Sequence, residues 1–115
     1  MHEYSIVQAL IRRAEETARA HAARRVEGLR VRIGTLAGVE PVLLLAAFEV
    51  CREGTLLGDA ELSIESVEAQ WACRCCGCGI AAGGALRCEA CGGPGQLVAG
   101  SEIELDSIAL EVDDV

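Results

Sequence analysis

The sequence lacks lysine entirely, and aromatic residues make up only 3% of its 115 residues. No apolar run approaches the roughly eighteen residues of a membrane-spanning helix. The N-terminus also has no basic stretch followed by an apolar stretch, the pattern that directs secretion. Because this pattern is absent, we expect a cytoplasmic protein. Because 51% of the residues are hydrophobic and few of these are aromatic, we expect its core to be aliphatic. The length fits one domain, or one domain with a small insert.

The charge is strongly negative and unevenly spread. The formal net charge is −8 at pH 7, and residues 1–34 carry seven arginines against four acids, whereas residues 35–115 carry three arginines against fourteen acids. So acidic a chain is a poor partner for phosphate backbones, and we expect neither nucleic acid nor a membrane as a partner. The sequence also shows no nucleophile–base pair and no phosphate-cradling glycine loop, so we expect no enzymatic activity.

The hydrophobic pattern predicts an α+β fold: a small mixed three-stranded sheet with two helices, plus an inserted zinc-ribbon domain. A helix over 5–23 is indicated by apolar residues spaced three and four apart, namely Ile6, Val7, Leu10, Ile11, Ala14 and Ala18. A second helix is predicted over 40–53, and strands over 26–34, 60–68 and 102–112. In the last strand the alternation slips by one residue, which indicates a β-bulge at Asp106-Ser107.

A cysteine- and glycine-rich block interrupts this pattern. Residues 71–100 contain six of the seven cysteines and eight of the thirteen glycines, and little that could form a core. In a chain without a secretion signal, cysteines point to metal rather than to disulfides. We therefore predict a zinc-ribbon domain over 71–100, inserted into a domain made of 1–70 and 101–115, with a bound metal as its cross-link.

Two C-x-x-C turns, about a dozen residues apart, form the usual frame of a zinc ribbon. The second pair is Cys88 and Cys91. The first is ambiguous, because Cys73/Cys76 and Cys75/Cys78 both satisfy C-x-x-C-G. We favour Cys73 and Cys76, since Ile80 then stands four residues after the second ligand, where it can cover the site. Four sulfur ligands leave no open position on Zn²⁺, so the zinc is predicted to be structural rather than catalytic.

The first three residues, Met1-His2-Glu3, suggest a second metal site of different chemistry. A free terminal amine, the backbone amide nitrogen of His2 and its imidazole could together wrap one ion. Nitrogen donors of this kind suit Ni(II) or Cu(II) in planar geometry. The simpler alternative is that His2 merely follows the initiator methionine.

Taken together, these features resemble the HypA/HybF family of nickel metallochaperones for [NiFe]-hydrogenase maturation. The resemblance covers nearly the whole chain and is carried by the order and spacing of several motifs: Met1-His2-Glu3 with Ser5-Ile6, Ile33-Gly34, Glu40-Pro41 with Phe48-Glu49, the Cys73-x-x-Cys76-Gly77 and Cys88-x-x-Cys91-Gly92 pairs, and Glu102-x-Glu104-Leu105. It implies nickel delivery in concert with the GTPase HypB, ending at the hydrogenase large subunit. In some bacteria the same family also supplies urease.

Carried over by residue, the resemblance makes His2 the nickel ligand, with the Met1 amine and the amides near His2 and Glu3 as its companions. It also matches Cys73, Cys76, Cys88 and Cys91 to the family's zinc ligands. Two features depart from the family pattern: Cys75 and Cys78 are additional thiols, and the zinc block contains no histidine. The alternative function is that of a zinc-ribbon adaptor for proteins or nucleic acids, which the acidic charge and the scarcity of aromatics disfavour.

Overall fold

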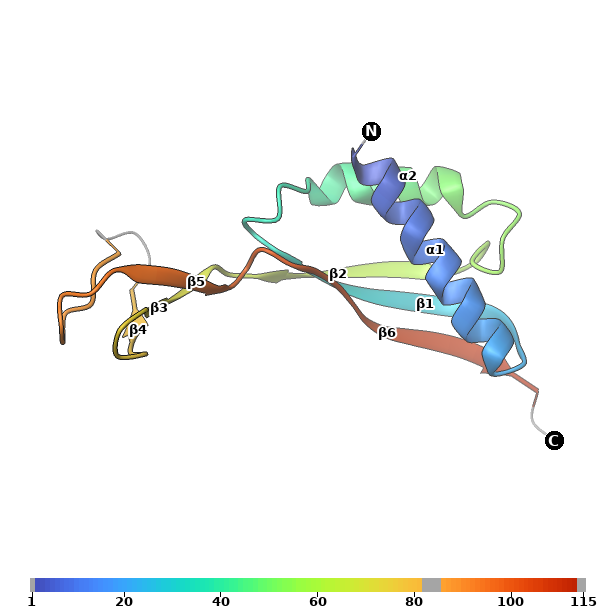
Figure 1. The fold of residues 1–115 in the computed structure, drawn as a ribbon. Coiled ribbons are helices and arrows are strands. Elements are labelled where there is room, and N and C mark those ends of the chain that lie inside the picture. Colours follow the sequence, from blue (N-terminus) through green and yellow to red (C-terminus); the bar gives the residue numbers. More distant parts are fainter. Residues whose placement is uncertain (1, 82–85, 114–115) are drawn as a thin grey trace. The chain divides into compact units, whose positions relative to one another are not determined.

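The computed structural model describes residues 2–81 and 86–113. In chain order its elements are α1 (His2–Ala20), β1 (Ala23–Gly34), α2 (Pro41–Cys51), β2 (Glu61–Val67), β3 (Gln70–Cys73), β4 (Gly79–Ile80), β5 (Gly95–Ala99) and β6 (Ile103–Val112), as labelled in Figure 1. The expected α+β fold, with two helices, a three-stranded sheet and a cysteine-rich insertion, is confirmed. Among the described residues, no helix has both the length and the apolar character needed to cross a bilayer.

The chain divides into two compact units. The helix–sheet unit comprises Met1–Arg32, Val39–Glu65 and Glu104–Val115, and the cysteine unit comprises Ile33–Gly38 and Ser66–Ile103. The domain boundaries at residues 71 and 100 stay a prediction. The compact cysteine unit reaches beyond them on both sides and takes in the residues that follow β1.

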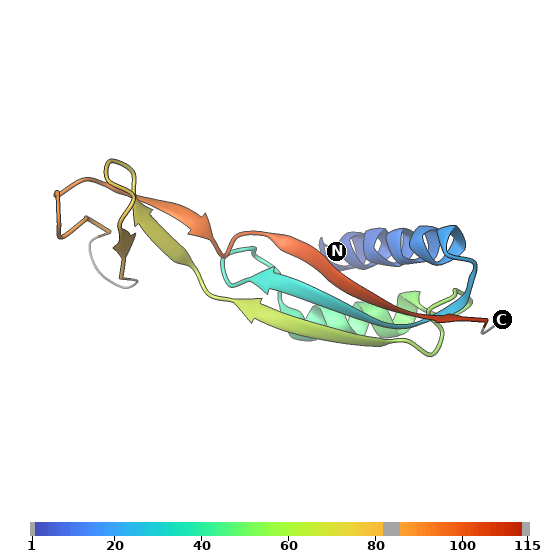
Figure 2. The same cartoon turned by 90° about the horizontal axis from the view of Figure 1, so that it is seen from below.

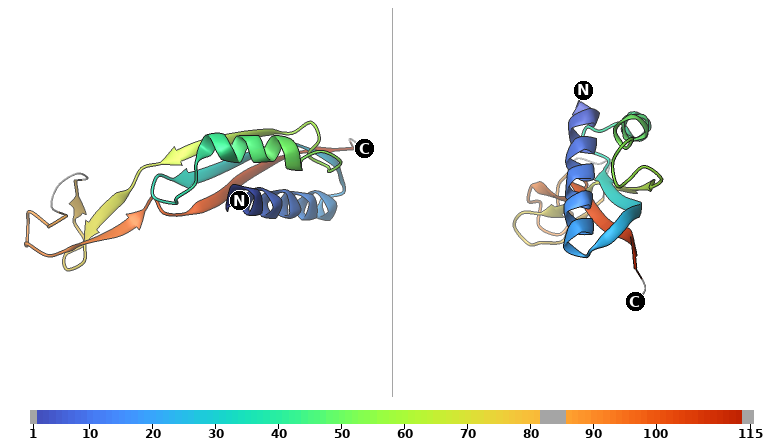
Figure 3. Two further views of the ribbon diagram at one scale, coloured as in Figure 1. Left: turned by 90° about the horizontal axis from the view of Figure 1, so that it is seen from above. Right: turned by 90° about the vertical axis from the view of Figure 1, so that its right-hand side faces the viewer.

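The helix–sheet unit has two layers. Its sheet has the strand order β2-β1-β6, and the view from below in Figure 2 shows the strands in front of both helices. The two helices pack against each other and lie on one face of the sheet, as Figure 3 shows from above. One side of the sheet therefore supports the core, while the other carries charged side chains such as Arg25, which lies 2.7 Å from Glu111.

The core of this unit comes from the apolar stripe of α1 and from the inward faces of β1 and α2. Five of the six residues predicted for the α1 stripe are buried: Val7, Leu10, Ile11, Ala14 and Ala18. On β1 the buried side chains include Val26, Leu29 and Val31, and on α2 they are Leu44, Ala47 and Phe48. In β6 the predicted change of phase is present, because Asp106 and Ser107 are both exposed.

The cysteine unit contains a second three-stranded sheet of order β4-β3-β5, in which both pairings are antiparallel. Its register sets Trp71 opposite Ile80 and Cys73 opposite Gly95. Among the described residues of 66–103, the only buried apolar side chains are those of Cys73 and Cys88. This sheet therefore has almost no hydrophobic core of its own.

The loop after β1 joins the cysteine unit through backbone hydrogen bonds. The Gly34 N–H donates to the Glu102 carbonyl at 2.9 Å, and the Leu36 N–H donates to the Gly100 carbonyl at 2.8 Å. A Cβ atom at Gly34 would collide with the Gly100 carbonyl, and Gly100 itself has a φ of 105°. Both positions therefore require glycine, because only glycine permits this close approach and this dihedral angle.

Candidate metal sites

The sulfur atoms of Cys73, Cys76, Cys88 and Cys91 all lie within 4.8 Å of one another. The Sγ atoms of Cys73 and Cys91 are 3.4 Å apart, and those of Cys76 and Cys88 are 3.5 Å apart. A tetrahedral zinc site with zinc–sulfur bonds of about 2.3 Å has sulfur–sulfur edges of about 3.8 Å. This edge length lies between the 3.4 Å separation of Cys73 and Cys91 and the 4.8 Å within which all four sulfurs lie, so the four thiolates are spaced closely enough to hold one ion.

The two turns that carry these cysteines repeat the same hydrogen bonds. In the first turn, the Cys73 N–H donates to the Cys78 carbonyl at 2.7 Å and the Gly77 N–H donates to the Cys73 carbonyl at 3.0 Å. In the second turn, the Cys88 N–H donates to the Gly93 carbonyl at 2.9 Å and the Gly92 N–H donates to the Cys88 carbonyl at 2.8 Å. Cys73 thus occupies the same place in its turn as Cys88 does in the other.

The glycine conformations indicate the same register. Gly77 and Gly92, which follow Cys76 and Cys91, have φ values of 79° and 75°. These left-handed conformations turn the chain back after the second cysteine of each pair, and glycine adopts them without strain. Gly79, the corresponding glycine for a Cys75/Cys78 pair, lies in strand β4 instead. Among the described residues, Cys75 and Cys78 are not members of the four-sulfur group.

Backbone N–H groups surround the Cys73 sulfur. The N–H groups of Cys76 and Cys75 approach its Sγ with N–S distances of 3.4 and 3.3 Å. These hydrogen bonds, the one from Cys76 first, outweigh the effect of burial and lower the pKa of Cys73 to about 6. At Cys91 the Gly93 N–H acts to lower the pKa, but the neighbouring sulfurs of Cys73, Cys76 and Cys88, together with burial, raise it to about 12. The opposite directions of these two shifts show that the sulfurs of the cluster titrate as one coupled group.

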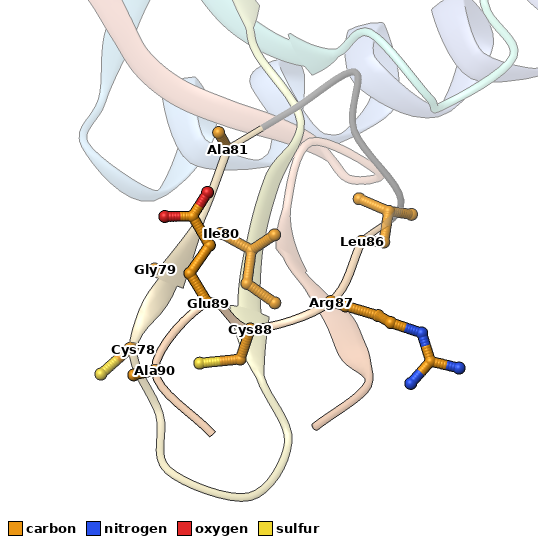
Figure 4. Close-up of a pocket in the computed structure, with 9 residues that line it drawn as sticks. All are labelled: Cys78, Gly79, Ile80, Ala81, Leu86, Arg87, Cys88, Glu89 and Ala90. Atoms are coloured by element: carbon orange, nitrogen blue, oxygen red, sulfur yellow. The ribbon is translucent and has the colours of Figure 1, made fainter. Parts of the chain in front are cut away.

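A pocket of about 500 Å³ lies beside Cys88 in the cysteine unit. Figure 4 shows the side chains of Ile80 and Leu86 on its apolar side and the Cys78 thiol at its other side, next to Ala90. Ile80, which the sequence predicted as an apolar cover for the cysteine site, lines the same pocket as Cys88.

The N-terminal residues lie in the helix–sheet unit. Met1, predicted as a nickel ligand, lies outside the described residues, while His2 is exposed and is the first residue of α1. The sequence predicted that this helix begins at residue 5, but in the structure it begins at His2. Glu3 is half-buried, and its carboxylate accepts a hydrogen bond from the Glu40 N–H at 3.4 Å. Hydrogen bonds from its own N–H and then from that of Glu40 lower the pKa of Glu3, although burial opposes them.

Two contacts of these sites were not foreseen from the sequence. The first is the Glu3–Glu40 hydrogen bond, which ties the start of α1 to the residue that precedes α2. The second is the position of Gly93, where a Cβ atom would lie 3.0 Å from the sulfurs of both Cys73 and Cys75. The sequence shows glycine at position 93, in the run Gly92-Gly93-Pro94. It does not show that the two sulfurs lie against this glycine.

The chain is similar to known proteins over nearly its whole length. Residues 1–110 match the family model described as "Hydrogenase/urease nickel incorporation, metallochaperone, hypA". The hydrogenase maturation factor HypA of Wolinella succinogenes is 40% identical over 120 residues, which cover 99% of this chain and 98% of that protein. The HypA of Aquifex aeolicus is also 40% identical and covers 98% of this chain and 100% of its own.

Solved structures show the same likeness. A solution structure described as HypA protein has a TM-score of 0.83 and 30% identity, with 98% of each chain covered. The solution structure of the nickel metallochaperone HypA from Helicobacter pylori has a TM-score of 0.73 and 29% identity, and the match covers 96% of this chain and 98% of that chain. With its fold, its four-sulfur cluster and a family match over nearly its whole length, this chain belongs to the HypA family of hydrogenase maturation nickel metallochaperones.

Proposed function

We propose that this chain carries nickel. It binds Ni(II) through the Met1 amine, the His2 ring and the backbone amides near His2 and Glu3. It then passes the ion, with a HypB-type GTPase, to the large subunit of a [NiFe]-hydrogenase. Urease maturation proteins are a second class of partner. The observation that carries this proposal is the exposed His2 at the first position of α1, in a member of a nickel-incorporation family.

The start of α1 is chemically suited to a nitrogen-rich site. The first N–H groups of an α-helix have no acceptor within the helix. An amide nitrogen there can therefore release its proton to solvent and bind a metal without breaking a helical hydrogen bond. Amine, amide and imidazole nitrogens are donors that Ni(II) accepts in square-planar geometry. Because His2 is exposed, an incoming partner can reach the ion and replace these ligands. Such access suits a carrier, which must release its cargo.

We further propose that Cys73, Cys76, Cys88 and Cys91 hold a structural Zn²⁺. The spacing of their sulfurs supports this assignment, and so do the N–H groups that approach the Cys73 sulfur. A zinc ion bound there would cross-link two turns that have almost no core to hold them, and four thiolates would close its coordination sphere. No position is then left for a substrate, so the proposal includes no enzymatic activity. It places the protein in the cytoplasm, where such thiols stay reduced.

The exposed surface of α2 supports the partner part of the proposal. Val42, Leu43 and Val50 expose 69, 54 and 60% of their surface, so this helix is apolar on its outer face as well as on its core face. Exposed apolar patches of this kind mark protein–protein contact sites. The Glu3–Glu40 hydrogen bond connects this helix to the proposed nickel site. A protein that docks on α2 would therefore lie close to His2.

Nickel titration calorimetry on the untagged, zinc-loaded protein tests the proposal. The chain has two histidines, and His21 is exposed at the opposite end of α1, so His21→Ala is a matched control for His2→Ala. We expect one nickel per chain in the unchanged protein and in His21→Ala, and no stoichiometric binding in His2→Ala. Zinc content should be the same in all three. Nickel binding that survives His2→Ala, or that is lost in His21→Ala, contradicts the N-terminal site.

A further inference from the structure

We propose that the outer surface of α2 binds a basic, apolar segment of a partner protein. The apolar side chains of this segment would pack on the helix, and one of its arginines or lysines would enter an acidic hollow beside it. This inference deepens the proposed docking of a partner on α2, on which it rests, by naming the chemistry that recognises the partner.

The apolar part of this surface runs along the outer side of α2. The large side chains there, each at least 41% exposed, are those of Val42, Leu43, Leu45 and Val50. Within the residues that the structure describes, no other element of the helix–sheet unit lies over α2 in the view from above in Figure 3. A partner that packed on these side chains would remove them from water, which favours binding.

A hollow of about 510 Å³ opens beside this helix, between α2 and the start of β2. Leu45 and Glu49, which stand about one helical turn apart, line it from α2, while Asp59 and Glu61 line it from the other side. Leu45 and three carboxylates therefore border one space. A partner segment that packs on Leu45 would lie within reach of these carboxylates.

Arg52 is the only cation among the described residues that line the hollow, and its guanidinium is already bound. Its Nη1 donates to the Ala60 carbonyl at 2.7 Å, and its Nη2 donates to the Glu49 carboxylate at 2.9 Å. This arginine therefore neutralises one of the three carboxylates and has no free donor pair for the other two.

Those other two carboxylates keep most of their charge available. Asp59 has an ion pair at 3.7 Å with Arg25, but the nearer partner of Arg25, at 2.7 Å, is Glu111. In the described part of the chain, Glu61 is exposed and forms no ion pair. A cationic side chain of a partner would balance this excess of negative charge.

The charge of the hollow also distinguishes between the possible occupants of α2. Its carboxylates would repel the phosphate groups of a nucleic acid or of an anionic membrane. A second copy of the chain that presented its own α2 surface would add further carboxylates without a free cation. A basic segment with apolar side chains fits both the helix and the hollow, and the opposite charges would also steer its approach.

The test is a selection of random peptides, displayed on phage, for binding to the full-length, zinc-loaded protein. We expect the enriched peptides to combine large apolar residues with arginine or lysine and to lack aspartate and glutamate. A synthetic copy of an enriched peptide should bind about tenfold more weakly to Val42→Ala/Leu45→Ala, which removes apolar contact area. It should bind about threefold more weakly to Glu61→Gln, which removes one carboxylate of the hollow.

Two exposed residues that do not line the hollow provide matched controls. Glu16→Gln removes a carboxylate from the exposed side of α1, and Val98→Ala shortens an exposed valine of β5. Both variants should bind the peptide as tightly as the unchanged protein does. Added salt should weaken binding to the unchanged protein more than binding to Glu61→Gln, because salt screens the charge contact.

Enriched peptides that are acidic or uncharged but still depend on Val42 and Leu45 would overturn the inference and leave the docking on α2 standing. No enrichment, or equal binding to Val42→Ala/Leu45→Ala and the unchanged protein, would overturn both. Equal weakening by Glu16→Gln and Glu61→Gln would also overturn the inference, and so would a dimer in sedimentation that Val42→Ala/Leu45→Ala abolishes. The nickel titration of His2→Ala tests the nickel site separately, because none of these variants changes His2.

Discussion

The two units of this chain keep their order by different means. In the helix–sheet unit, two helices and a sheet bury a continuous set of aliphatic side chains around Phe48 and Leu44. In the cysteine unit, the buried apolar side chains of the described residues of 66–103 are Cys73 and Cys88, both members of the sulfur cluster. Apolar burial stabilises the first unit, whereas the second depends on its ligands and on the ion that they would hold.

The two proposed metal sites differ in the same way. The cysteine site has four sulfurs brought together by two turns with matching hydrogen bonds, so it would hold its ion permanently. The N-terminal site places one exposed imidazole at a helix start, so it would hold its ion briefly. From this comparison we infer that an ion that stays bound needs four preformed protein ligands, whereas an ion that is delivered needs a solvent-exposed site.

The largest expected effect is the loss of the cysteine unit when its metal is removed. Structural zinc contributes on the order of 10 kcal/mol to small sites of this kind, more than this unit can replace by packing. Chelation, or Cys88→Ser, should abolish amide protection in strands β3 and β5. Protection in α1 and β1 should persist. Hydrogen exchange with mass spectrometry measures both regions in one experiment.

Cys51→Ser is the control for this experiment, because Cys51 is a half-buried thiol of α2 in the helix–sheet unit. It should leave protection in β3 and β5 unchanged. Global unfolding of Cys88→Ser would show that the two units do not depend on different sources of stability.

The second effect is a loss of stability in the helix–sheet unit alone. A substitution in its apolar core should leave the cysteine unit folded. Phe48 is 1% exposed and is among the largest fully buried side chains of the chain, so Phe48→Ala should reduce the free energy of unfolding of the helix–sheet unit by about 3–5 kcal/mol. Zinc content should not change. Urea unfolding followed by circular dichroism gives the energy, and elemental analysis gives the zinc.

The matched control is Val50→Ala on the same helix, where 60% of the side chain is exposed. Its cost should stay within about 0.5 kcal/mol. A cost for Val50→Ala equal to that of Phe48→Ala, or loss of zinc on Phe48→Ala, would break the comparison.

The smallest effect concerns the choice between the two overlapping C-x-x-C pairs. Gly77 has a φ of 79° with open space around its Cβ position, and Gly79 has equally open space without a left-handed φ. Gly77→Ala should therefore cost about 1–2 kcal/mol, which weakens zinc binding roughly tenfold. Gly79→Ala should have no effect. Competition titrations with a chelator of known affinity measure both, and the reverse order of effects would favour Cys75 and Cys78 as the ligands.

Local patterns in the sequence were enough to predict the two helices and three strands of the helix–sheet unit and the cysteine frame, but not the strands β3, β4 and β5. The spacing of Val7, Leu10 and Ile11 identified the buried face of α1, because helical periodicity depends only on neighbouring residues. The C-x-x-C spacing likewise predicted Cys88 and Cys91, while Cys73 and Cys76 were only favoured over Cys75 and Cys78 because of the position of Ile80. The phase slip at Asp106-Ser107 was visible because strand alternation also depends only on neighbouring residues.

Features that depend on distant residues were not predictable. The sequence favoured Cys73 as the partner of Cys76, but it did not show the hydrogen bonds that support this pairing, which repeat in the second turn as far along the chain as Gly93. The role of Gly34 depends on its close approach to Gly100, and the extension of α1 back to His2 accompanies a contact between Glu3 and Glu40. Each of these is a tertiary contact between segments whose sequences give no sign of the other.

X-ray absorption on the untagged protein loaded with one zinc and one nickel tests the central claim most directly, because each metal is observed at its own edge. The account predicts four sulfur neighbours around zinc at about 2.3 Å. Around nickel it predicts only nitrogen or oxygen neighbours, among them an imidazole. Sulfur neighbours around nickel, or nitrogen neighbours around zinc, would contradict the division of the two ions between the two units.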